Sequence, residues 1–322
     1  MAKVLVTGGA GFIGSHLCNQ LVEIGHSVRT LDVGLPDPSL FPEKQVEFCR
    51  GSALDINEVI RATQDCERVV HLAAMLGVAR TEQQRLGCLN ANILGTVNIL
   101  EACVRDGVKK VVFASSSEVY GDQAGDSFAE ANPVNPRTVY AVSKLAGEEF
   151  LRAYKERYGL EYSVVRLFNV YGPGQREDFV IPRFVSNVLS HIPPKVYGEG
   201  NQVRTFSYVA DIVDGIIAAL DSPMANGQVL NLGNPAEPIS IRDLACRIIR
   251  IAGMSLEPTL VPYTEADRTQ DREVGWRKPS IEKARRLLGY NPRVNLDAGL
   301  DLVLDWARRR AATTAVTSNK AS

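Results

Sequence analysis

The feature that most constrains this chain is a short apolar strand that runs into a glycine-rich turn and then a helical pattern. Residues 3–6 predict the strand, and residues 8–14 (GGAGFIG) hold Gly8, Gly11 and Gly14 at the spacing G-x-x-G-x-x-G. Glycine lets a backbone turn tightly and approach a diphosphate, whose charge is stabilised by free N–H groups and the helix dipole. Alone the motif is weak, because glycine-rich turns also serve as plain connections.

An acidic residue strengthens the interpretation of this turn as a dinucleotide site. Asp32 ends the second predicted strand (28–32), 18 residues after Gly14, where a carboxylate can accept hydrogen bonds from a ribose diol. An acid there repels a 2′-phosphate, so the sequence predicts NAD rather than NADP. Asp55, after the third predicted strand, is a second candidate for the adenine side, and its alternative role is a helix cap.

Short β-branched runs alternate with longer amphipathic stretches through the first half of the chain, which predicts an α/β fold with a doubly wound parallel sheet (Rossmann fold). The predicted strands are 3–6, 28–32, 46–50, 68–72, 110–115 and 162–167, and the predicted helices include 13–24, 89–106 and 140–158.

Beyond Asn169 a Pro/Gly-rich passage predicts loops and short helices of a smaller lobe interleaved in sequence. A strand at 205–209, a helix at 211–221 and a strand at 228–232 are expected to return to the sheet. The predicted division is 1–170, with returning segments at about 205–232, for the dinucleotide domain; 171–204 and 233–311 for the substrate lobe; and 312–322 for a flexible tail.

Composition excludes several functional classes. The 36 basic and 37 acidic residues give a net charge of −1, which offers no global field for nucleic acid or an acidic membrane surface. No apolar run approaches the ~20 residues of a membrane span, and the N-terminal strand does not resemble a signal peptide. The six cysteines are scattered without metal-ligand spacing, so we expect no metal site and a cytoplasmic protein.

Tyr140 is the one tyrosine followed by a lysine four residues later, Lys144. On a helix these residues share a face, and a neighbouring cation lowers a tyrosine pKa from ~10 towards neutrality, which makes a general base. An incidental pair on an amphipathic helix is the alternative. Ser116 stands at the end of the fifth predicted strand, 24 residues upstream, where open α/β sheets bind ligands. The run of serines at 115–117 could instead only cap the following helix.

Together these motifs resemble the extended short-chain dehydrogenase/reductase superfamily, specifically its NAD-dependent nucleotide-sugar epimerase/dehydratase family. The resemblance covers nearly the whole chain. It is carried by the glycine turn with Thr7, Asp32, His71-Leu72-Ala73-Ala74, Asn92-Ile93-Leu94-Gly95-Thr96, the serine segment 115–121, the Tyr140/Lys144 pair and Asn169-Val170-Tyr171-Gly172-Pro173.

The resemblance implies that Tyr140 removes the proton of a sugar hydroxyl while hydride passes to NAD. It implies that Lys144 lowers the pKa of Tyr140 and holds the nicotinamide ribose, and that Ser116 bonds the same hydroxyl. The cofactor contacts that it implies are Gly8, Gly11, Phe12, Ile13, Gly14, Asp32, Asp55, Leu72, Ala73, Ala74, Asn92, Tyr140 and Lys144. The implied contacts to a nucleotide-diphosphate sugar are Asn169, Tyr197, Arg204 and Arg272. A homodimer through a four-helix interface, formed by 89–106 and 140–158, is also implied; packing of both helices on their own sheet is the alternative.

The step after oxidation is open at this point. We expect a C4 epimerase acting through a 4-keto-sugar, because epimerases are the commonest members. Ser117 and Glu118, with Arg277, resemble UDP-glucuronate decarboxylases, although those of the xylose pathway usually carry Tyr-Asp-Glu-Gly-Lys where this chain has Tyr-Ala-Val-Ser-Lys. A dehydratase or C5-type epimerase with Glu118 as carbon base is a further alternative, and a non-catalytic dinucleotide-binding protein is a minor one. Arg176 could meet a uronate carboxylate or a phosphate, or be a plain loop charge.

Overall fold

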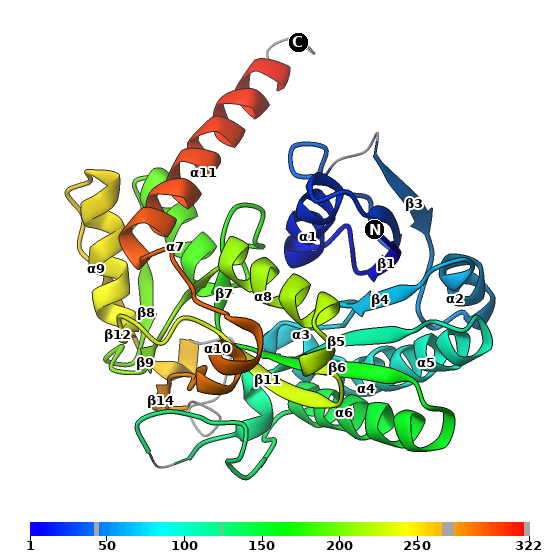
Figure 1. Cartoon of the computed structure of the whole chain (residues 1–322). Helices are drawn as coiled ribbons and strands as arrows, with labels where there is room; N and C mark the ends of the chain where they lie inside the picture. The colour runs from blue at the N-terminus through cyan, green and yellow to red at the C-terminus, as the bar shows by residue number, and fades with distance from the viewer. Residues whose placement is uncertain (42–44, 124, 266–273, 319–322) are drawn as a thin grey trace.

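The computed structural model describes the chain except residues 42–44, 124, 266–273 and 319–322 (Figure 1). Its centre is a seven-stranded sheet of order β11-β6-β5-β4-β1-β2-β3, in which every neighbouring pair is parallel. The strands are β1 (Lys3–Thr7), β2 (Ser27–Asp32), β3 (Val46–Arg50), β4 (Arg68–His71), β5 (Lys110–Ser116), β6 (Glu161–Leu167) and β11 (Gln228–Leu232). The predicted doubly wound sheet is confirmed.

Helices cover both faces of this sheet, and alternate residues of each strand supply the two cores. On β1, Val4 and Val6 pack towards one side with Leu17 of α1, whereas Leu5 packs towards the other with Ile99 of α5. The helices of the first side include α1 (Phe12–Glu23) and α8 (Val209–Asp221); those of the second are α2 (Ile56–Thr63), α5 (Gly95–Arg105) and α6 (Val139–Tyr158). Near-continuous apolar strands are what a sheet buried on both faces requires.

The predicted helix 89–106 is a composite. It consists of α4 (Arg85–Leu89), a π-helical turn (Asn90–Leu94) and α5, and it follows the short α3 (Val78–Gln83). The run Arg85–Arg105 is long and apolar enough to span a membrane by length and composition, but 44% of its apolar window is buried inside the protein. Core helices of soluble proteins pass the same test, so this is weak evidence for a span.

A group of smaller elements lies on the left of Figure 1. Its helices are α7 (Val180–Leu189), α9 (Ile241–Ala252), α10 (Glu282–Leu288) and α11 (Leu296–Ser318). Its strands form two small sheets, β12 (Ile239–Ser240) with β9 (Val203–Arg204) and β14 (Trp276–Arg277), and β13 (Thr259–Val261) with β8 (Lys195–Tyr197). Short 3₁₀ turns lie at Ser117–Tyr120, Pro223–Ala225 and Tyr263–Glu265.

One expectation about the second half needs correction. The strand expected at 205–209 is only β10 (Ser207–Tyr208), and it pairs with β7 (Val170–Tyr171) in a separate two-stranded sheet; β11 alone returns to the central sheet. Helix α11 ends at Ser318, and the flexible tail expected at 312–322 stays a prediction.

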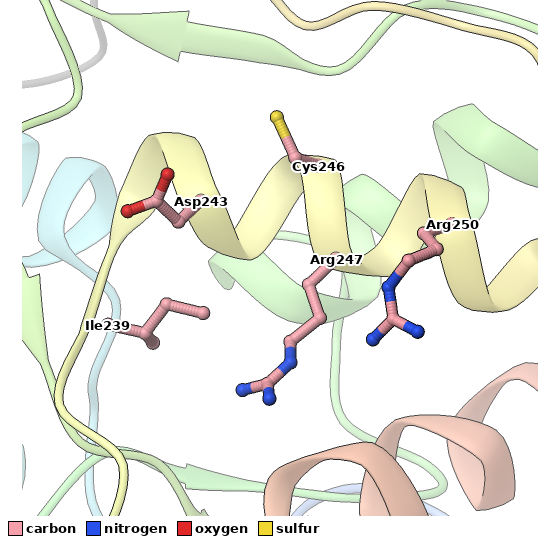
Figure 2. Close-up of a pocket in the computed structure, with 5 residues that line it drawn as sticks. All are labelled: Ile239, Asp243, Cys246, Arg247 and Arg250. Carbon is pink, nitrogen blue, oxygen red and sulfur yellow. The ribbon is translucent and has the colours of Figure 1, made fainter.

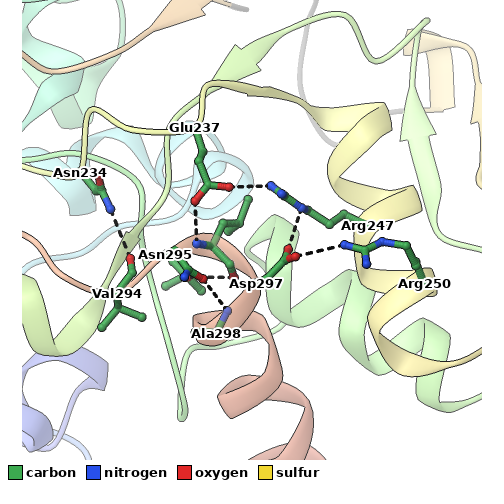
Figure 3. A network of polar contacts seen from close by, with 10 residues as sticks. Asn234, Glu237, Arg247, Arg250, Val294, Asn295, Asp297 and Ala298 are labelled. Atoms are coloured by element: carbon green, nitrogen blue, oxygen red, sulfur yellow. Dashed lines mark hydrogen bonds and ion pairs between the residues drawn. The ribbon is translucent and has the colours of Figure 1, made fainter.

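A polar network ties the start of α11 to α9 (Figure 3). The Arg247 guanidinium contacts Glu237 at 3.0 Å and Asp297 at 2.7 Å, and Arg250 contacts the other Asp297 oxygen at 3.1 Å. Glu237 also accepts a hydrogen bond from the Leu296 N–H at 3.2 Å. Asp297 lies in the first turn of α11, where a carboxylate interacts favourably with the helix dipole.

Candidate active site

The glycine turn between β1 and α1 has a geometry that only glycine tolerates. Gly8 has φ +75°, and a Cβ on it would lie 2.7 Å from the Ala73 nitrogen. A Cβ on Gly14 would lie 2.1 Å from the Gly8 carbonyl oxygen. Gly11 caps α1 without a side-chain hydrogen bond, and Phe12 and Ile13 begin the helix. The turn therefore leaves a bare helix N-terminus at the carboxyl edge of the sheet, which suits a phosphate.

Both acidic cofactor candidates are engaged by backbone N–H groups. Asp32 accepts a hydrogen bond from the Ala10 N–H of the glycine turn at 3.0 Å and one from the Gly34 N–H at 2.9 Å. Its carboxylate is thereby fixed beside the turn. Asp55 is the N-cap of α2 and accepts from Asn57 and Glu58 N–H groups at 2.9 and 3.3 Å. The capping role of Asp55 is thus present, and its contact with a cofactor stays a prediction.

Tyr140 of α6 and Ser116 at the end of β5 are brought together, close enough for the Ser116 hydroxyl to favour the charged form of the phenol. The Lys144 ammonium lies 5.8 Å from the centroid of the Tyr140 ring and 4.9 Å from that of Phe113. Burial lowers the pKa of Lys144 to about 8. The structure therefore brings these three residues together, and their catalytic roles stay a prediction.

The direction of the Tyr140 pKa differs from the expectation that Lys144 lowers it. Burial raises the pKa of the Tyr140 phenol above its ordinary value and the Glu118 charge raises it further, while the Ser116 hydrogen bond acts in the opposite direction. The phenolate is disfavoured because the site removes it from water and places a carboxylate nearby.

Glu118 stands in the 3₁₀ turn that follows β5, close to the catalytic candidates. Thr138, the N-cap of α6, donates its hydroxyl to Glu118 at 3.1 Å and accepts from the Ala141 N–H at 3.1 Å. Ser116 caps the turn by accepting from the Glu118 N–H at 3.2 Å, so the capping alternative and the contact with Tyr140 both hold. Ser117 is buried.

A buried polar chain, which sequence reasoning did not assign, joins the glycine strand to α6. His71 bonds Thr7 at 2.6 Å through Nδ1 and Thr96 at 3.1 Å through Nε2. The Thr96 hydroxyl donates to the Asn92 carbonyl at 2.6 Å.

Asn92 continues this chain to the helix of Tyr140. Its amide nitrogen donates to the Ser143 hydroxyl at 2.9 Å, which in turn donates to the Tyr140 carbonyl at 2.7 Å. Its amide oxygen accepts from the Met75 N–H at 2.7 Å, which orders the loop after Leu72, Ala73 and Ala74. The i+3 position of Ser143 was the only sequence signal for this link.

The predicted substrate residues lie on several elements. Arg204 of β9 and Arg277 of β14 are register partners, and the Arg277 Nε is buried without a hydrogen-bond partner among the described residues. Asn169 adopts φ +34° and donates to the Thr205 carbonyl at 2.9 Å, next to Arg204. These three residues are therefore brought together.

Tyr197 and Arg176, two other predicted substrate residues, make contacts with different partners. The Arg183 guanidinium lies 5.5 Å from the Tyr197 ring centroid. Arg176 pairs with Asp178 at 2.8 Å on an exposed loop, which supports the loop-charge alternative. Arg272 lies outside the described residues.

A cavity of about 350 Å³ beside α9 is a separate feature (Figure 2). Its lining residues are Ile239, Asp243, Cys246, Arg247 and Arg250. The two arginines point to one side of α9 and Cys246 to the other. Asp297 contacts both arginines, and Glu237 contacts Arg247. The lining of this cavity holds no counterpart of the Ser116 and Tyr140 hydroxyls.

Comparison with known proteins agrees with this geometry. A family model described as the NAD dependent epimerase/dehydratase family matches residues 4–233. The UDP-N-acetyl-alpha-D-glucosaminuronate decarboxylase of Bacillus cytotoxicus is 36% identical, over 95% of this chain and 98% of its own. The UDP-glucuronate 4-epimerase of Thermodesulfobacterium geofontis is 33% identical, over 96% and 97%. The solved UDP-glucose 4-epimerase of Thermotoga maritima, with UDP-glucose, superposes with a TM-score of 0.89 at 30% identity, over 96% and 99%.

Proposed function

Because this chain belongs to the NAD-dependent epimerase/dehydratase family, we propose that it is an NAD-dependent 4-epimerase of a UDP-sugar. The observation that carries the proposal is that Ser116 and Tyr140 lie together, with Lys144 one helical turn away. This pair stands at the carboxyl edge of the sheet, the edge that also carries the glycine turn and Asp32.

The residues present fit NAD. The glycine turn is sterically closed to any side chain at Gly8 and Gly14, so a diphosphate could approach its backbone, and Asp32 is fixed beside it for the adenosine ribose. Phe12, Ile13 and the loop Leu72–Ala74 would complete the cofactor contacts. NAD⁺, when bound, supplies the acceptor for the sugar hydride and a positive charge that favours the Tyr140 phenolate.

The protein groups carry out the proton chemistry. Tyr140 removes the proton of the C4 hydroxyl, and Ser116 donates its single O–H to the phenolate while its lone pairs can accept from a sugar hydroxyl. Lys144 places its ammonium beside the Tyr140 ring, on the same face of α6. Arg204, Arg277 and Asn169 would hold the nucleotide diphosphate, since a guanidinium pairs with phosphate oxygens in a bidentate manner. Epimerisation then needs the keto-sugar to rotate, so that its opposite face would take back the hydride and the oxygen would take back the proton from Tyr140.

A second candidate is decarboxylation of a UDP-uronate, and Glu118 is the observation that favours it. Its carboxylate influences Tyr140 directly and is held by Thr138, although a simple 4-epimerase has no use for a second carboxylate. The Bacillus cytotoxicus relative named above is a decarboxylase of a UDP-uronate. Arg277 would then face the carboxylate end of the sugar.

A panel of UDP-glucose, UDP-N-acetylglucosamine and UDP-glucuronate, with the GDP- and dTDP-sugars as controls, tests the proposal by mass spectrometry and NMR. An unchanged mass with inverted coupling at C4 is the expected product. Loss of carbon dioxide from UDP-glucuronate would replace the first candidate by the second. No turnover of any sugar by NAD-loaded protein would overturn both.

The Tyr140→Phe variant tests the base. We expect turnover to fall by about 10²–10⁴-fold, the contribution of a general base, while NAD remains bound, as measured by release of the cofactor on denaturation. The matched control is Tyr158→Phe, which changes an exposed tyrosine at the end of the same helix and should leave the rate unchanged. Near-normal turnover of Tyr140→Phe would remove Tyr140 from the mechanism.

The proposal also includes a cytoplasmic homodimer. All six cysteines are unpaired thiols, as in a reducing compartment. The α4–α5 run and α6 pack side by side, and they expose Leu86, Leu94 and Val142. Two copies of this helix pair would give a four-helix interface.

A further inference from the structure

The face of α6 that carries Tyr140 and Lys144 also carries a third polar residue, Glu148. Tyr140, Lys144 and Glu148 follow one another at four-residue spacing, so all three face the sheet. Glu148 is fully buried. Its carboxylate accepts two parallel hydrogen bonds from Arg166 of β6, at 2.9 and 2.7 Å, and a third from the Ser115 hydroxyl at 2.5 Å.

These contacts hold both ends of the catalytic turn. Ser115 immediately precedes Ser116, so Glu148 fixes the start of the turn. At its other end the Arg166 guanidinium lies 4.7 Å from the centroid of the Tyr120 ring, and the Tyr120 hydroxyl donates to Asn231 at 2.7 Å. The segment that carries Ser116 and Glu118 is therefore clamped between α6, β6 and β11.

Stability alone is a poor explanation for this pair. The side chains of Arg166 and Glu148 are 4% and 0% exposed, and a buried ion pair often gives no net stabilisation relative to an apolar pair of similar size. The surroundings are also tightly packed: a Cβ on Gly147 would lie 2.4 Å from the end of the Phe113 ring of β5. A small change in the distance between α6 and β5 would therefore shift Tyr140 relative to Ser116, because tight packing leaves no free space to absorb it.

We propose that Glu148 and Arg166 are positioning residues that fix the separation of α6 and the end of β5, and so keep the Ser116 hydroxyl within hydrogen-bond distance of Tyr140. The roles of Ser116 and Tyr140 are those of the proposed function. Loss of this hydrogen bond raises the pKa of the phenol, because a donor favours the charged form.

The test replaces the pair by apolar side chains, Glu148→Met with Arg166→Met, which leaves no unpaired buried charge. The matched control is Lys155→Met with Glu161→Met, an ion pair of 2.6 Å that also joins α6 to β6 but lies at the opposite end of α6 from Tyr140. We expect the first double variant to stay folded and NAD-loaded with kcat about tenfold lower, the worth of one hydrogen bond, KM within about twofold, and the acid limb of the kcat profile moved to higher pH.

Three further measurements make the outcome decisive. A crystal structure of the double variant should show the Ser116 and Tyr140 hydroxyls beyond hydrogen-bond distance. In a Ser116→Ala background the double substitution should cost almost nothing more, since coupled residues are non-additive. Ser115→Ala removes one of the hydrogen bonds to Glu148 and leaves no buried charge without a partner. It should shift the pH profile of kcat in the same direction, and it provides the test if the double variant does not fold.

A folded double variant with wild-type kcat, pH profile and Ser116–Tyr140 geometry would overturn the proposal, as would full additivity with Ser116→Ala. Failure of the proposed function is distinguishable. In that case wild-type protein converts no sugar, while the crystal structures still decide whether the Glu148–Arg166 pair sets the position of Ser116.

Discussion

The phenol of Tyr140 is subject to opposing effects from two neighbours that belong to one turn. Glu118 raises the pKa of the phenol and the Ser116 hydrogen bond lowers it. The pairing of Tyr140 with Ser116 was predictable because each stands at a diagnostic place, a helix face and a strand end. The sign of the pKa shift was not, since burial and the position of Glu118 are properties of the folded site.

Glu118→Gln separates these effects. Removal of the Glu118 charge lowers the pKa of Tyr140, so the phenolate persists to lower pH and the acid limb of the kcat profile should move to lower pH. A simple 4-epimerase should keep its rate at the optimum within about threefold, whereas decarboxylation that relies on Glu118 should fall by about 10²-fold or more. Glu156→Gln, an exposed position of α6, is the control. An acid limb that stays in place would contradict the inferred contact.

The buried side chain of His71 affects the stability of the protein at acid pH. Burial, with the Lys144 charge, lowers the pKa of His71 to about 3, against ~6.5 in an unfolded chain. The unfolded state therefore binds the extra proton, and stability falls as pH decreases below ~6.5, by about 2 kcal/mol down to pH 5.

Urea unfolding across this range measures the loss. In a His71→Asn variant the part of the slope due to His71 should disappear, while the exposed His191→Asn should retain the wild-type slope. Identical slopes in wild type and His71→Asn would show that His71 is not held neutral.

At the scale of the element, the strands were predictable to within a residue or two, because central strands such as β1, β5 and β6 are buried and rich in apolar residues. The π-helical turn Asn90–Leu94 was not, because it satisfies contacts of Asn92 with Met75 and Ser143 that are distant in sequence. The position of β10 was also mispredicted. This strand has only two residues, which pair with β7, and so short a strand shows no detectable periodicity.

The α9–α11 contact offers a prediction at this scale. Asp297→Asn removes the ion pairs to Arg247 and Arg250 and the favourable charge at the start of α11, so the free energy of unfolding should fall by about 0.5–1.5 kcal/mol. Added salt should shrink the difference, since the Asp297 side chain is 43% exposed. Asp305→Asn, which loses only an exposed pair within α11, should change stability by less than about 0.5 kcal/mol. Equal effects would contradict a stabilising role for the network.

Across the whole molecule, the sequence predicted two interleaved segments from the Pro/Gly-rich break after Asn169. The return of β11 to the sheet agrees with that interleaving, while the division into lobes stays a prediction. The extent of α11 could not be anticipated, because its last residues are small and polar and lack an apolar face.

The homodimer is the prediction that belongs to the molecule as a whole. Leu94 and Val142 are 51% and 44% exposed on adjacent helices, and burial of the exposed half of each side chain gives about 0.7–1.5 kcal/mol. Light scattering after size exclusion should therefore find a dimer for wild type and a monomer for Leu94→Glu with Val142→Glu. Leu302→Glu, which changes a 45% exposed leucine of α11, is the control and should remain dimeric. A charged double variant that stays dimeric would place the interface elsewhere, and a monomeric wild type would leave this apolar helix pair exposed to water.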